Sequence, residues 1–220
     1  MALSKLTYNS LNVTAAASKA VGFGSGADDL SASLSGGAMT FIKKLTSDGS
    51  DDDLSFVDGT SSVVLDNTYK EYLFIFKDIH PQNDDVIFQF QGNASGGSGY
   101  DETITSSAFN VFNREDDTGT TFGYHASSDL AQGTGFQTLC EGLGADNDHS
   151  LTGWLKLFNP SSTTYVKHWT ARTQYVHASD RSYSMVTAGY FNTTSAIDEI
   201  QFKMDGGDID AGDICLYGIN

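Results

Sequence analysis

The residues with the widest chemical repertoire in this sequence are its histidines, and their spacing matches no catalytic or metal-binding pattern. No two form an H-x-x-x-H pair, and none stands at zinc-ligand spacing from a cysteine. A nucleophilic triad needs a serine or cysteine together with a histidine and an acid, but the sequence has no G-x-S-x-G signature. We therefore expect structural roles for His80, His125, His149, His168 and His177.

Paired carboxylates are a second chemical possibility, because glycoside hydrolysis uses two of them. Neighbouring residues of a strand point to opposite faces of a sheet, so adjacency in the sequence does not bring two carboxylates face to face. With 28 acidic residues in the chain, adjacent acids are also expected by chance. The sequence therefore predicts no catalytic residue and no enzyme, although it contains the acidic groups Asp101–Glu102, Glu115–Asp117 and Asp198–Glu199.

Three turns rich in aspartate could supply oxygen ligands to calcium, which tolerates irregular loops. They span residues 48–53, 146–148 and 205–213. No segment matches the twelve-residue calcium loop that ends in glutamate, and Asp with Gly is also ordinary turn chemistry. We predict no metal or other cofactor, and calcium at these turns stays an open alternative.

Aromatic and sulfur-containing side chains leave two further questions open. Tyr124, Trp154 and Trp169 could stack on sugar rings if exposed, but an aromatic residue on a strand usually belongs to the core. Cys140 and Cys215 are the only cysteines, and both lie in apolar runs where a free cysteine behaves as a small hydrophobic residue. A disulfide between these two residues remains possible.

The elements that would position all these residues are β-strands. The chain has 14 Phe and 10 Tyr but only 2 Pro, and turn-forming residues recur at roughly ten-residue spacing. Residues 85–91 alternate so that Phe88 and Phe90 share one face. Residues 69–79 are apolar without a break at Leu73 to Phe76, which is typical of a strand covered on both faces. The Gly-rich residues 92–99 indicate a mobile loop.

This pattern begins at Met39 and divides the chain into two parts. Residues 1–38 are rich in Ser, Ala, Gly and Asp and show no sustained period, which predicts an extended N-terminal arm. Residues 39–220 predict an all-β domain, a jelly-roll-like β-sandwich. Phe88 and Phe202 are expected to share one core.

Charge excludes some partners. Twelve basic against 28 acidic residues give a formal net charge of −16, which would repel nucleic acid and an anionic membrane surface. No apolar run reaches the roughly 20 residues that span a bilayer. Polar residues such as Lys5 and Lys19 interrupt every apolar stretch near the N-terminus, so we expect no secretory signal and no membrane insertion.

Four phrases of the sequence together resemble structural proteins of marine bacteriophages, described as virion, tail-fibre or appendage proteins. The likeness extends from about residue 54 to the end and, more weakly, into the arm. It has no catalytic motif and transfers no individual site residue. The phrases are FVDGTSSVVLDNTYKEYLFIFKDIHP, LFNPSSTTYVKHWTAR, AGYFNTTSAIDEIQFKM and IDAGDICLYGIN.

The resemblance implies a non-enzymatic virion surface protein, assembled in the host bacterial cytoplasm, in a tail fibre or receptor-binding appendage. It also implies a homotrimer, with residues 1–38 attaching to other virion proteins and a host cell-surface glycan as a partner. The alternative within this class is a capsid decoration or knob protein on the phage head. From a different class, a carbohydrate-binding module or a glycan-cleaving enzyme remains the competing hypothesis.

Overall fold

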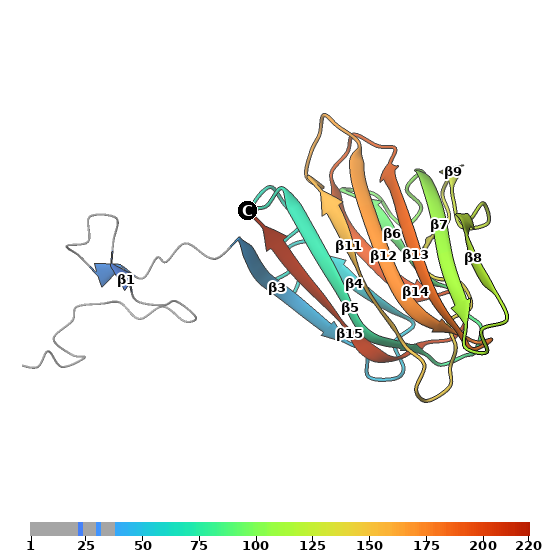
Figure 1. Ribbon diagram of the computed structural model, residues 1–220. Coiled ribbons are helices and arrows are strands. Elements are labelled where there is room, and N and C mark those ends of the chain that lie inside the picture. Colours follow the sequence, from blue (N-terminus) through green and yellow to red (C-terminus); the bar gives the residue numbers. More distant parts are fainter. Residues whose placement is uncertain (1–21, 24–29, 32–37) are drawn as a thin grey trace, which may run out of the picture. The chain divides into compact units, whose positions relative to one another are not determined.

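The computed structural model describes residues 22–23, 30–31 and 38–220 of the chain (Figure 1). Within the first 38 residues, two short strands, β1 (Gly22–Phe23) and β2 (Leu30–Ser31), pair antiparallel. The predicted extended arm otherwise lies outside the described residues.

Residues 39–220 form an antiparallel β-sandwich, which confirms the predicted fold class (Figure 1). The four successive strands between residues 53 and 114 alternate between the two sheets, as in jelly-roll sandwiches. The larger sheet contains, in spatial order, β3 (Met39–Thr46), β15 (Ile209–Ile219), β5 (Glu71–Pro81), β11 (Leu151–Phe158), β12 (Lys167–His177), β13 (Arg181–Phe191), β7 (Ile104–Arg114) and β8 (Thr120–Tyr124), with β9 (Ala131–Gly133) beside β7. The smaller sheet contains β10 (Gln137–Thr138), β6 (Phe88–Ala94), β14 (Ile197–Met204) and β4 (Asp53–Val57). Among the described residues there is no helix with the length and apolarity needed to cross a bilayer.

The core between the sheets is built around Phe202 of β14. Its ring lies 5.2 Å from that of Phe76 and 5.4 Å from that of Phe74, both on the facing strand β5. It also stacks on Phe88 of the neighbouring strand β6, with ring centroids 6.0 Å apart. All four rings are fully buried. The expectation that Phe88 and Phe202 share one core is therefore confirmed.

Two sequence-based expectations fail in β5 and β6. Within the described residues, the apolar strand β5 is covered on one face: Phe74 and Phe76 are buried, whereas Leu73 and Ile75 on the opposite face are only partly buried. The predicted loop 92–99 is wrong for its first three residues, because β6 continues to Ala94. Close packing explains the glycine at position 92 of this strand, because a Cβ atom there would lie 2.9 Å from the Phe191 ring.

The two cysteines are separate and buried, so the structure has no disulfide between them. The Cys140 sulfur accepts a hydrogen bond from the Phe88 amide at 3.3 Å. Burial raises the pKa of the Cys140 thiol to about 12. A thiol with this pKa stays protonated at neutral pH and is a poor nucleophile.

Candidate functional site

The outer face of the nine-stranded sheet carries an apolar and aromatic row that crosses seven strands. Strand alternation turns Leu73 and Ile75 outward while Phe74 faces the core. The pairing registers then align each outward residue with a partner on the next strand. From β15 to β8 the row consists of Cys215, Ile75, Trp154, Arg172, Val186, Phe109 and Tyr124.

Exposure along this face is greatest at its two edges. On β7 and β8, Phe109, Val111, Phe122 and Tyr124 are 42–76% exposed, and the rings of Phe109 and Phe122 pack edge to face at 6.1 Å. On the opposite edge, Phe41 of β3 is 56% exposed and packs against Tyr217, its register partner on β15. Large exposed apolar patches on a soluble domain mark interaction surfaces.

Carboxylates are scarce on this face, although the chain is strongly acidic. Among the outward residues of its paired strands, Glu71 lies 2.5 Å from Lys156, and Asp213 lies 3.0 Å from Lys44. The Thr46 hydroxyl, followed by Lys44, stabilises the charged form of Asp213 and lowers its pKa. Arg172 is exposed in the middle of the row. The part of the face on β11, β12, β13, β7 and β8 contains no aspartate or glutamate, whereas Asp78 of β5 and Asp210 of β15 are exposed near the aspartate-rich turns.

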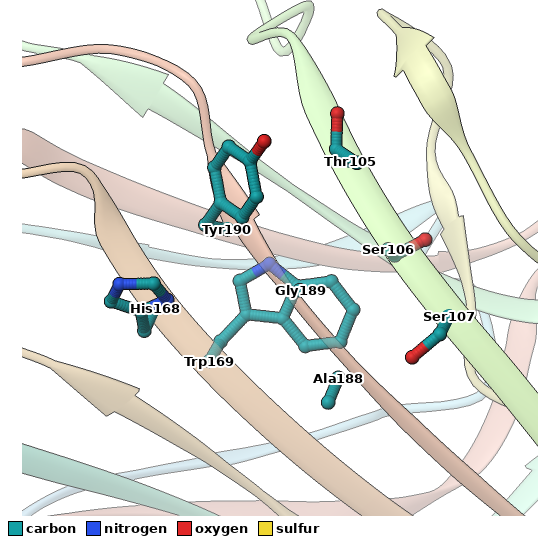
Figure 2. Close-up of a pocket in the computed structure, with 8 residues that line it drawn as sticks. All are labelled: Thr105, Ser106, Ser107, His168, Trp169, Ala188, Gly189 and Tyr190. Atoms are coloured by element: carbon teal, nitrogen blue, oxygen red, sulfur yellow. The ribbon is translucent and has the colours of Figure 1, made fainter.

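A shallow pocket opens on the same face where small residues leave the backbone of β12, β13 and β7 uncovered (Figure 2). His168 and Tyr190 lie at one side, with ring centroids 5.9 Å apart, and Thr105 and Ser107 lie across from them. The indole of Trp169 packs against Gly189, and its N–H has no hydrogen-bond partner. The lining residues include no carboxylate.

The three aromatic residues considered for sugar stacking do not lie together. Tyr124 and Trp154 stand in the outer row, but Trp169 is 2% exposed and packs on Phe90 in the core at 5.0 Å. The stacking role is therefore wrong for Trp169. The reason is the alternation of side chains along β12, which points its odd-numbered residues toward the core.

The three aspartate-rich turns meet at one end of the sandwich, which the sequence did not indicate. Asp51 pairs with Ile209 through the backbone, and Asp210 approaches both Gly49 and His80. His80 Nε2 lies 3.3 Å from the backbone oxygen of Asp146. Among the described residues, no three His, Cys, Asp or Glu side chains are arranged to hold a metal ion.

Like charges nevertheless affect protonation at this acidic end. A hydrogen bond with Asp52 raises the pKa of Asp208, and the nearby charges of Asp52 and Asp51 act in the same direction. The Asp208 carboxyl is therefore harder to ionise than an isolated carboxyl group.

Two of the three acid groups considered for catalysis have structural partners. Glu102 accepts a hydrogen bond from the Ala94 amide at 3.1 Å, closing the end of β6. Asp116 accepts hydrogen bonds from the Thr118 hydroxyl and amide in the turn between β7 and β8, and these lower its pKa.

One cluster contains the residue types of a nucleophilic triad and was missed in the sequence. His125 Nδ1 lies 3.1 Å from the hydroxyl of Ser127, which is exposed, and His125 Nε2 lies 3.2 Å from Glu141. Ser127 and the buried Ser128 also hydrogen-bond directly to Glu141, at 3.2 and 2.6 Å. Glu141 accepts hydrogen bonds from both serines and pairs with His125, so the cluster ties the turn at residues 125–128 to the chain after β10.

Replacing Glu141 with glutamine is expected to lower the free energy of unfolding by about 1–2 kcal/mol, because two hydroxyls and an imidazole lose a charged acceptor. Ser127→Ala, which removes one exposed hydroxyl, should change stability by less than about 0.5 kcal/mol. Urea denaturation measures both. We also expect no reaction with a fluorophosphonate probe; labelling of Ser127 that His125→Gln abolishes would identify an active site instead.

No protein-family model, curated protein or solved structure was found to match this chain. The class of protein is therefore defined by the fold and the surface alone: an antiparallel β-sandwich with one broad, acid-poor aromatic face.

Proposed function

We propose that this chain is a non-enzymatic surface protein of a marine bacteriophage particle, located in a tail fibre or receptor-binding appendage. The observation that carries the proposal is the row of apolar and aromatic side chains across the outer face of the nine-stranded sheet, which suits a component of a larger assembly better than a free enzyme. The resemblance of its sequence phrases to virion proteins supports the same class.

Residues 39–220 would form the projecting domain, and residues 1–38 would attach it to other virion proteins. Among the described residues, those of the hydrophobic core lie between Leu54 and Leu216, all within the proposed projecting domain. A capsid decoration protein would use the same sandwich at a different place on the particle.

A second candidate function, glycan binding, is favoured by one observation. The shallow pocket combines the His168–Tyr190 pair with the hydroxyl groups of Thr105 and Ser107, and rings with hydroxyls are groups that recognise sugars. A receptor-binding appendage would bind a host glycan in this way.

In particles assembled with the tagged full-length chain, gold-labelled antibodies should mark the tail appendages in electron micrographs. A chain lacking residues 1–38 should fold, with a melting temperature close to that of the full chain, but should not be incorporated. The physical reason is that the truncation keeps every core residue of the described part of the chain while it removes the proposed attachment segment.

Labelling of the head instead would identify the chain as a capsid decoration protein. Absence of the chain from purified particles would contradict the virion proposal altogether. Normal incorporation of the truncated chain would contradict only the attachment role of residues 1–38.

A further inference from the structure

The central strand β5 has an apolar sequence on two faces but a covering layer on one. Its inward residues Tyr72, Phe74 and Phe76 are buried against the smaller sheet. Its outward residues Leu73 and Ile75 have no covering layer within the described part of the chain. Apolar residues on both faces are typical of strands that are covered on both sides.

We propose that the outer face of the nine-stranded sheet packs against a second copy of this chain. The inference goes beyond the proposed virion function, because it concerns the isolated protein. Exposed aromatic residues stand at both edges of the face, Phe41 on β3 and Phe122 on β8, with a continuous row between them. Such a face resembles the core of a protein interface, which is rich in aromatic residues and arginine and poor in carboxylates.

Charge favours this face over every other route to self-association. Two copies with a formal charge of −16 each repel one another through most of their surfaces. On this face β11, β12, β13, β7 and β8 contain no aspartate or glutamate, and Glu71 and Asp213 are paired with Lys156 and Lys44. The other exposed carboxylates of β5 and β15, Asp78 and Asp210, lie toward the acidic end. The turns at the acidic end and the polar outer face of the smaller sheet, with Gln89 and Gln201, offer no comparable apolar contact.

The area is sufficient for a stable complex. Eight strands side by side, some of them eleven residues long, present a face on the order of 1,000 Å² at the usual strand spacing and rise. A standard interface buries about 800 Å² on each partner. The face alone could therefore supply a complete contact.

The side chains favour a protein over a sugar as the occupant. Val186, Phe109, Val111 and Phe122 form a contiguous apolar patch across β13, β7 and β8, and none of these side chains carries a hydrogen-bonding group. Serine, threonine and asparagine side chains of the same strands surround the patch. A sugar exposes a hydroxyl at nearly every carbon, so over the patch it would leave hydroxyls unpaired. The apolar patch of a second copy would leave no polar group unpaired at the same contact.

The test measures the mass of the full chain in solution, by light scattering after size-exclusion chromatography and by sedimentation at several concentrations. The unmodified chain should have the mass of two or more copies, and its association should strengthen with added NaCl as like charges are screened. Phe122→Glu and, independently, Val186→Glu should weaken association at least tenfold. Gln89→Glu adds the same charge to the outer face of the smaller sheet and should have no effect.

The melting temperature of each variant shows whether it is folded, so that loss of association can be separated from loss of the fold. Phe122 is 76% exposed, and its replacement should leave the fold intact. A monomeric full-length chain, or a Phe122→Glu variant that associates like the unmodified chain, would overturn the proposal. A monomer that binds a glycan array, with binding lost in Phe122→Glu, would overturn it in favour of a sugar. None of these results would decide whether the chain belongs to a virion, which the particle-labelling experiment tests separately.

Discussion

Replacing Phe202 with alanine is expected to destabilise the sandwich by about 3–5 kcal/mol, the usual cost of truncating a buried phenylalanine. Its ring contacts rings from both sheets, including Phe56 of β4 at 6.3 Å and Phe76 of β5 at 5.2 Å. The cavity left by the substitution would therefore lie between the layers, where the facing strands are held apart by other fully buried rings and cannot close it.

Chemical denaturation of Phe202→Ala, beside a Gln89→Ala control, measures this cost. Gln89 lies on the outer face of β6, next to Phe88, so its truncation should change the free energy of unfolding by less than about 0.5 kcal/mol. Equal losses in the two variants would mean that the assigned faces of the smaller sheet are incorrect.

Of the substitutions proposed for this protein, Gly189→Val is expected to have the second largest effect. It should lower the free energy of unfolding by about 3 kcal/mol, the upper end of the usual cost of adding carbon atoms to a packed site. A Cβ atom at Gly189 would lie 2.6 Å from the backbone oxygen of Thr105 and 2.7 Å from the Trp169 ring. The oxygen belongs to the paired strand β7 and cannot move without breaking the sheet, and the indole is buried on its other side against Phe90.

Gly123→Val is the matched control for this prediction. Gly123 also lies in a strand of the nine-stranded sheet, but a Cβ atom there would meet nothing within 4 Å. Valine favours strands, so we expect unchanged or slightly higher stability. A thermal melt that shifts both variants equally would show that glycine is required in these strands for a reason other than space.

The sequence alone determined the fold class and the faces of individual strands. Alternation over residues 85–91 correctly placed Phe88 and Phe90 in the core, and the run from Met39 to Thr46 coincides with β3. These features are local: a period of two between consecutive residues decides which side chains share a face. The net charge is likewise a property of composition.

The tertiary structure decided everything that depends on pairing between distant segments. Registers joining β15, β5 and β11 assemble the outer row. Only the layer order shows that Ile75 lies on a face that no sheet of the described residues covers. The same long-range pairing brings His125 to Glu141 and the turn at Asp51 to Ile209. Strand alternation specifies two faces, but which face is buried depends on the strands and sheets that pack around it. Those contacts join residues far apart in the chain, and no local pattern records them.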